Sequence, residues 1–218
     1  MPRTTFEQAI KELQEDLIKM GSLVEESIDK AVTSLANRDA KLSEEVVAGD
    51  DAIDAMETEI ENKCMTLLAR QQPIAKDLRL IATVLKIITD LERMGDHATD
   101  IAKVNLRLDG QPLIKPLVDI PRMAVLTQNM VRNALNAFIR EDIKLAEQVG
   151  QDDDEVDHLY GQIFRELLVF MLQDPRTISQ ATYLLFVGNY LERIGDHATN
   201  IGERVLYLVT GEKKDLNV

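Results

Sequence analysis

The sequence predicts an all-α fold of two tandem antiparallel three-helix bundles, related by a pseudo-twofold symmetry that arises from internal duplication. Three observations predict this fold. Apolar residues recur at helical spacing along almost the whole chain, the second half repeats the first, and only 10 glycines and 6 prolines occur in 218 residues. We expect a first three-helix repeat at 1–108, a linker at 109–120 and a second three-helix repeat at 121–218.

Each helix of the first repeat follows from an apolar stripe and its flanking residues. Asp39 is a good N-cap for a second helix that runs to about Gln72, and Pro73 lies in the turn that follows. The third helix is expected from about 75 to 108, where Asp109-Gly110 ends it. The stripe of the first helix steps by three and four through Phe6, Ile10, Leu13, Leu17, Met20, Val24, Ile28, Ala31 and Leu35.

The second repeat matches the first at an offset of 103 residues, so that Asp39 corresponds to Asp142. The turn at Pro73 corresponds to Asp174-Pro175, where Asp174 can cap a helix whose first residue is proline. The offset falls to 100 in the third helices, where two small deletions explain the change. There the likeness is nearly literal: Leu91-Glu92-Arg93-Met94-Gly95-Asp96-His97-Ala98-Thr99-Asp100-Ile101 returns as Leu191-Glu192-Arg193-Ile194-Gly195-Asp196-His197-Ala198-Thr199-Asn200-Ile201.

The charge and the apolar runs limit the classes of partner. The 38 acidic and 25 basic residues give a formal net charge of −13, which argues against nucleic acid and against anionic lipid surfaces. One cysteine, Cys64, forms no internal disulfide. The first residues show no signal peptide, and the apolar runs are too short to cross a bilayer. We therefore expect a soluble, cytoplasmic protein with no direct membrane insertion.

The common catalytic motifs are missing from the sequence, so we expect no enzyme. No Walker loop or Gly-x-Ser-x-Gly elbow occurs, and no histidine lies near Cys64 in the sequence. Glu155-x-x-His158 resembles half of a di-iron motif, but Ala55 stands at the matching position of the first repeat. An exposed polar helix face explains this pair more simply. A carboxylate-bridged metal-storage protein or non-haem metalloenzyme remains the alternative from another functional class.

Acidic residues recur at every fourth position in the third helix of each repeat. Such residues share one face of a helix, and their repulsion costs a few tenths of a kcal/mol per pair. Because this arrangement occurs twice at matching places, we expect a compensating cation at each place. A solvated surface, with Arg93 and Arg193 pairing with the neighbouring acids, is the alternative. The stripes are Glu92, Asp96 and Asp100 in the first repeat and Glu192, Asp196 and Asn200 in the second.

The second helix of each repeat brings further carboxylates to the same height. Asp51 lies 22 residues before Pro73 and Gly95 lies 22 residues after it, so the two are level in a straight antiparallel hairpin. Carboxylates from two helices form an oxygen-rich site that suits Mg, Ca, Mn or iron. The additional ligands predicted on this basis are Asp51 and Asp54 with Asp50 beside them, and Asp154 and Asp157 with Asp153 beside them.

These features resemble the PhoU family. Both repeats carry Glu-Arg-x-Gly-Asp-His-Ala near the end of the third helix. The family's Arg-x-x-Pro-x-x-x-Asp-Leu-Arg turn is matched at 70–79, and its Asp-Pro-Arg-Thr-Ile turn at 174–178. Members hold multinuclear metal clusters at Glu/Asp-x-x-x-Asp motifs. The resemblance therefore implies metal at Glu92, Asp96, Asp100, Glu192 and Asp196, while Asn200 departs from the acidic pattern.

The resemblance also implies a function. It implies a negative regulator of phosphate-starvation signalling and a modulator of phosphate-specific transport, which connects the transporter's ATPase subunit to a sensor histidine kinase. We expect divalent or trivalent metal ions, with iron, Mn, Mg and Zn as candidates, and a homodimer. Arg93, His97, Arg193 and His197 border the acidic stripes, and we expect them to contact partner proteins.

Overall fold

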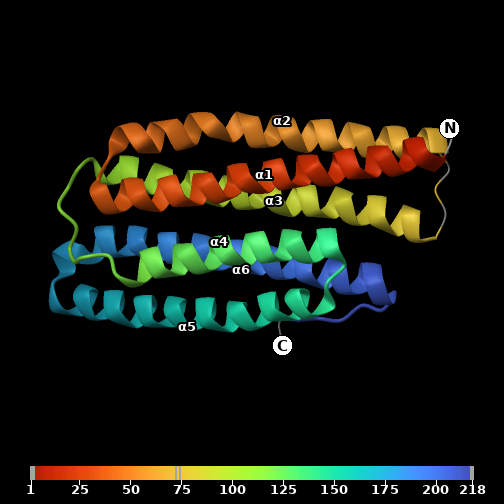
Figure 1. The fold of residues 1–218 in the computed structure, drawn as a ribbon. Helices are drawn as coiled ribbons and strands as arrows, with labels where there is room; N and C mark the ends of the chain where they lie inside the picture. Colours follow the sequence, from red (N-terminus) through yellow and green to blue (C-terminus); the bar gives the residue numbers. More distant parts are fainter. Residues whose placement is uncertain (1–2, 72, 74, 217–218) are drawn as a thin grey trace.

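A computed structural model describes residues 3–71, 73 and 75–216, and it confirms the all-α prediction for them, since none of these residues lies in a strand. Figure 1 shows the two three-helix units side by side, with antiparallel helices in each. The helices are α1 (Arg3–Asn37), α2 (Ala40–Gln71), α3 (Lys76–Leu108), α4 (Asp119–Arg140), α5 (Ile143–Gln173) and α6 (Ile178–Thr210), with a short 3-10 turn η1 (Pro175–Thr177) before α6.

The first turn of each unit has the same construction. Arg38 and Glu141 take the left-handed conformation, with φ of 58° and 52°, which ends the preceding helix. The next residue caps the following helix: Asp39 accepts a hydrogen bond from the backbone N–H of Leu42 at 3.1 Å, and Asp142 accepts two such bonds. Each cap satisfies N–H groups that the first helical turn leaves without partners. The predicted N-cap at Asp39 is confirmed, and Asp142, its counterpart in the second repeat, caps α5 in the same way.

The second turns differ between the units. In the second unit, Asp174 accepts a hydrogen bond from the backbone N–H of Arg176 at 3.0 Å and caps η1, whose first residue is Pro175. In the first unit, Ala75 precedes α3 with φ of 45°, and its neighbours 72 and 74 lie outside the described residues. The connection between the units begins at Asp109, which is left-handed and ends α3 as predicted.

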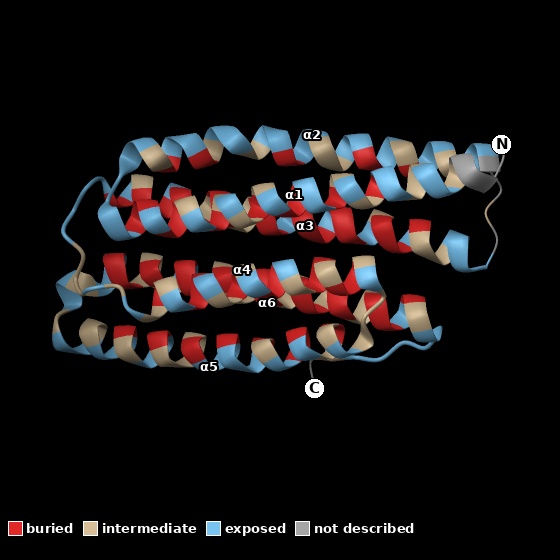
Figure 2. Cartoon of the chain, in the orientation of Figure 1, coloured by how far each residue is buried: buried red, intermediate tan, exposed pale blue. Residues whose placement is uncertain are grey.

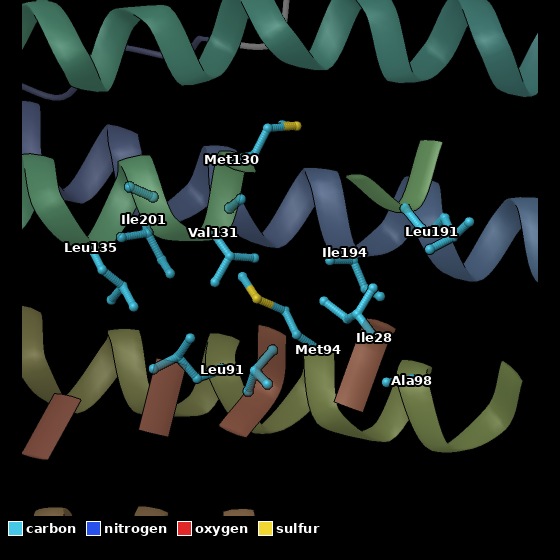
Figure 3. Close-up of a cluster of buried hydrophobic side chains, with 14 of the residues drawn as sticks. Ile28, Leu91, Met94, Ala98, Met130, Val131, Leu135, Leu191, Ile194 and Ile201 are labelled. Carbon is cyan, nitrogen blue, oxygen red and sulfur yellow. The ribbon is translucent and has the colours of Figure 1, made fainter. Parts of the chain in front are cut away.

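The two units share one core. Helix α3 packs against α6 and α1 packs against α4, while α2 covers α1 and α3 and α5 covers α4 and α6. Figure 2 shows that the buried residues face this centre and that the exposed faces of α2 and α5 point outward. Side chains of both units interleave in Figure 3, where Met94 lies opposite Val131 and Ile28 lies opposite Ile194. Burying each such side chain contributes about 1.5–3 kcal/mol.

A buried polar chain ties together the three helices of the first unit near its first turn. Asn105 donates hydrogen bonds to Ser43 Oγ at 2.8 Å and to the carbonyl of Asp39 at 3.1 Å. Ser43 donates to Ser34 Oγ at 2.8 Å, and Ser34 donates to the carbonyl of Ala31 at 2.8 Å. Each of these three side chains therefore has a hydrogen-bond partner, which buried polar groups require.

No helix in the described part of the chain is both long enough and apolar enough to span a membrane.

Candidate functional site

The duplicated run has the same surroundings in both units. Each residue from 91 to 101 is as buried as its counterpart from 191 to 201: the glutamates at 92 and 192 are partly buried, and the arginines at 93 and 193 are exposed. Gly95 and Gly195 are both buried. The repeat therefore preserves the environment of each side chain as well as the residue type.

The two glycines allow the second helix of each unit to approach closely. A Cβ atom on Gly95 would lie 2.9 Å from Ile53 Cδ1, and one on Gly195 would lie 2.7 Å from Asp153 Oδ1. Asp50 Oδ1 is 3.7 Å from the same position on Gly95. Asp50 and Asp153 therefore face the helix that carries the acidic stripe.

The acidic residues of α2 and α5 lie close to the predicted height along each hairpin. The residue that faces each glycine is, however, the one before the predicted residue: Asp50 faces Gly95, and Asp153 faces Gly195. Asp51 and Asp154, which we expected opposite the stripes, are exposed. Neighbouring residues on a helix are separated by about 100° around its axis. The sequence separation fixed the height along the hairpin and left this rotation open.

The first acidic group lies across α2 and α3. Burial raises the pKa of Glu92, and the charges of Asp96, Glu57 and Asp54 raise it further, while Arg93 opposes them. Burial also raises the pKa of Asp50, to which Asp54 and Asp96 contribute. Arg93 pairs with Glu92 and Asp96, with N–O distances of 3.4 Å to both. The members of this group are Asp50, Asp54, Glu57, Glu92 and Asp96.

The second acidic group lies across α5 and α6 in the same way. Burial raises the pKa of Asp157, followed by the charges of Asp196 and Asp154. Burial raises the pKa of Glu192 as well, and Asp196 and Asp157 add to the shift. The members of this group are Asp153, Asp154, Asp157, Glu192 and Asp196.

The two acidic groups suit a hard cation. Each consists of carboxylates only, and burial and neighbouring charges raise the pKa values of Asp50 and Glu92 in the first group and of Asp157 and Glu192 in the second. These shifts oppose the charged state of the four carboxylates, which a bound cation would favour. Within residues 3–71, 73 and 75–216, no three His, Cys, Asp or Glu side chains lie close enough together to hold a metal ion as placed. Metal binding would therefore require these side chains to turn toward a shared ion.

Asp100, the third member of the first stripe, also has a cationic neighbour. Asp100 contacts Lys103, with Oδ1 and Nζ 3.4 Å apart. Its charge also raises the pKa of Tyr190 on α6, after the larger effect of burial. Asn200 is partly buried at the matching position. Asp100 therefore affects a residue across the interface between α3 and α6 as well as a neighbour on its own helix.

His97 and His197 lie next to each other at the interface between α3 and α6. Their ring centroids are 5.8 Å apart, and His97 also stacks on Tyr190 at 5.7 Å. Burial, together with the charges of His197 and Arg193, lowers the pKa of His97 to about 4, although the charges of Asp100 and Asp96 oppose the shift. His97 is therefore neutral at pH 7.

A buried carboxylate holds His197 in place. Asp90 Oδ1 lies 3.0 Å from His197 Nδ1, and Asp90 Oδ2 accepts a hydrogen bond from Arg204 Nε at 3.0 Å and forms an ion pair with Arg204 Nη2 at 2.6 Å. Sequence reasoning missed Asp90, Arg204 and Tyr190. One signal was available, because an aspartate between Ile87 and Leu91 interrupts a buried apolar stripe and needs a partner.

The four residues expected to contact partners are therefore of two kinds. Arg93 and Arg193 are exposed, whereas His97 and His197 are partly buried and contact groups of this chain. That any of the four contacts another protein stays a prediction.

Glu155 and His158 lie on an exposed face of α5, as expected. His158 Nε2 lies 2.8 Å from Gln162 Nε2.

Comparison with known proteins gives consistent matches. The family model described as the PhoU domain matches residues 17–104 and 120–205. A Clostridium acetobutylicum protein named "Phosphate-specific transport system accessory protein PhoU homolog" is 44% identical over 218 residues, covering 100% of both chains. A protein of the same name from Aquifex aeolicus is 45% identical over 203 residues, 93% of this chain and 92% of the relative.

Two solved structures have the same fold. The crystal structure of PhoU from Pseudomonas aeruginosa has a TM-score of 0.90 at 40% identity, over 95% of this chain and 100% of that chain. The crystal structure of the phosphate transport system regulatory protein PhoU from Streptococcus pneumoniae has a TM-score of 0.89 at 33% identity, over 96% of this chain and 99% of that chain.

Proposed function

The chain belongs to the PhoU family, and from this we propose that it is a regulatory accessory protein of phosphate-specific transport and not an enzyme. The observation that supports this proposal most directly is the full-length match to a relative that is named as such an accessory protein. The two acidic groups, one across α2 and α3 and one across α5 and α6, agree with it, because they provide two matched surfaces for binding and contain no nucleophile with an adjacent base.

The proposed role is that of a cytoplasmic adaptor that acts as a negative regulator. In phosphate-rich cells it would contact both the transporter's ATPase subunit and a sensor histidine kinase, and it would keep phosphate-starvation signalling low. Arg93 and Arg193 are exposed beside the acidic groups and are available to a partner. The net charge of −13 favours association with basic surfaces, at a rate that falls as salt increases.

Deletion of the gene tests the regulatory role. We expect alkaline phosphatase output to rise in phosphate-rich medium and to return to a low level when the wild-type gene is restored. Restoration with the Arg93→Ala, Arg193→Ala double variant should leave output high if these residues contact a partner. Arg165→Ala, which removes an exposed arginine from α5, is the matched control and should restore repression. Low output in the deletion strain would contradict the regulatory role.

We also propose that the two acidic groups bind divalent or trivalent metal ions. Glu92, Asp96 and Asp54 would be ligands in the first unit, and Glu192, Asp196 and Asp157 in the second, with Asp51, Asp154, Asp100 and Asn200 at their edges. A bound ion would neutralise carboxylates that burial and repulsion now disfavour. We also propose that the protein forms a homodimer.

Elemental analysis of the purified protein tests metal binding. The Asp96→Ala, Asp196→Ala double variant should lose the metal and keep its helicity in circular dichroism. Asp29→Ala, an exposed aspartate on α1, is the matched control. Equal metal content in the double variant and the wild type would show that the acidic groups are not the sites. Oxidase turnover by iron-loaded protein would favour the metalloenzyme alternative.

A further inference from the structure

A basic cleft lies where the beginning of α3 meets the end of α6. Figure 1 shows these two helix ends on the same side of the molecule. The cleft has a volume of about 580 Å³, and the segment that follows α6 forms part of its wall. This volume falls within the range of sites that hold small organic ligands.

The lining of the cleft is positively charged, opposite in sign to the net charge of the molecule. Five of its eleven lining residues are cations and two are carboxylates, Glu203 and Asp215, in a protein whose net charge is −13. A local excess of positive charge in a concave site attracts anions. The five cations are Arg79, Lys86, Arg204, Lys213 and Lys214.

Three of these cations are available to a ligand. Asp90 neutralises Arg204, and Glu147 pairs with Lys214 at 2.6 Å. Arg79, Lys86 and Lys213 form no ion pair with any described residue. The buried Nε of Arg79 also lacks a hydrogen-bond partner in the described part of the chain, although buried donors are nearly always paired. A guanidinium with two ammonium groups suits a ligand that carries several negative charges, such as a phosphate ester.

One wall of the cleft is apolar. Leu78 and Tyr207 line it and are 46% and 38% exposed, so both are accessible to a ligand. Ala82 lies between the cations on the same helix. An aromatic ring beside cations favours a ligand with a flat, apolar portion as well as an anionic one.

The duplication shows that the cleft is particular to one end of the molecule. At an offset of 100, Arg79 corresponds to Ser179, Lys86 to Phe186, and Arg204 to Val104. The symmetry-related place therefore has none of these cations. A merely solvated helix face would not require an unpaired, partly buried arginine at one end only.

We propose that this cleft binds a small phosphorylated molecule of nucleotide size. Its phosphates contact Arg79, Lys86 and Lys213, and its flat apolar portion lies against Leu78 and Tyr207. The site is separate from the acidic groups and does not depend on the proposed regulatory function.

Isothermal titration calorimetry tests the proposal with ATP, AMP, adenosine and inorganic phosphate as probes. EDTA is present, so that ATP cannot bind through a metal at the acidic groups. We expect saturable binding of ATP or AMP, and binding at least about tenfold weaker for adenosine and for inorganic phosphate, since each lacks one part of the ligand.

Variants locate the site. Arg79→Gln with Lys86→Gln should weaken nucleotide binding at least about tenfold, because each removes a charge-assisted contact. Lys86→Gln with Lys213→Gln changes only exposed side chains, so it repeats the test without disturbing a partly buried residue. Lys41→Gln, at an exposed lysine on α2, is the control and should bind as the wild type does.

Three outcomes would overturn the proposal: no saturable binding of ATP or AMP at millimolar concentration, unchanged binding in both double variants, or inorganic phosphate binding as tightly as the nucleotides.

Discussion

The two units place the same helices around different interiors. Near its first turn, the first unit buries Ser34, Ser43 and Asn105 in a hydrogen-bonded chain. The same helix arrangement therefore accommodates either a hydrogen-bonded polar chain or an apolar contact, provided that all three helices supply the same kind of residue. The second unit supplies apolar residues at the matching buried positions: Ala137, Ala146 and Val205.

Placing a polar residue of the first unit's interior at the matching position of the second unit should have the largest effect on stability. Val205→Asn places an amide among Ala137 and Ala146, which offer no side-chain hydrogen bond, and it also removes buried apolar surface. We expect the free energy of unfolding to fall by about 3 kcal/mol or more, measured by urea denaturation. Adding Ala137→Ser and Ala146→Ser rebuilds the polar chain and should recover part of this loss. A triple variant less stable than Val205→Asn alone would contradict the equivalence of the two interiors.

Replacing Gly95 or Gly195 by alanine should destabilise the fold by a smaller amount, which is similar in the two units. Gly195→Ala and Gly95→Ala each force a methyl group against the second helix, at 2.7 Å and 2.9 Å from its nearest atom. We expect a loss of about 1–3 kcal/mol from each in thermal denaturation. Gly49→Ala is the control, because nothing lies within 4 Å of its Cβ position. Helix propensity should make that variant more stable by about 0.5–1 kcal/mol. Three effects of the same sign would rule out close helix approach as the cause.

The two acidic groups differ in the third residue of their stripes, Asp100 in the first unit and Asn200 in the second. We expect the first group to bind metal more strongly, because it has Asp100 where the second has Asn200. Asp100→Asn should weaken the stronger site, and Asn200→Asp should strengthen the weaker one, each by roughly tenfold, or about 1.4 kcal/mol. Metal titrations followed by calorimetry measure both. If neither exchange changes an affinity, residues 100 and 200 are not ligands.

Breaking the ion pair between Asp16 on α1 and Lys63 on α2 should have the smallest effect on stability. Burial raises the pKa of Asp16, but its hydrogen bonds with Lys63 and Lys19 outweigh burial and hold the pKa below the ordinary 3.8. A lowered carboxyl pKa stabilises the fold above pH 3.8, and this contribution is lost as the pH falls through the folded-state pKa. Lys63→Met should therefore cost at most about 1 kcal/mol at pH 7 and progressively less in acid. A loss that is independent of pH would point to packing of the Lys63 stem instead.

The fold could be predicted from the sequence because its signals are local or repeated. The stripe from Leu13 to Leu35 is buried, and Asp39 and Asp142 cap the helices that they precede. The rotation of α2 was not predictable, because helix periodicity leaves one residue of uncertainty and Asp50 rather than Asp51 faces Gly95.

The parts of the molecule formed between units could not be predicted. Periodicity identifies the apolar face of each helix but not which helix of the other unit covers it. The contacts of His97 with His197 and of Asp90 with Arg204 both depend on the packing of α3 against α6. The basic cleft joins Arg79 to Tyr207 in the same way, across more than half of the chain.

The antiparallel contact of α3 with α6 has a consequence for how the two halves can change over evolution. In a symmetric dimer of a single repeat, every substitution at such a contact appears twice, so an unfavourable pair of like residues cannot be avoided. Covalent linkage removes that restriction and lets each side of the contact mutate alone. Asp90 and Tyr190 occupy matching positions and now have different partners, His197 and His97. The linked chain also keeps the contact on dilution, because the two halves cannot separate by mass action.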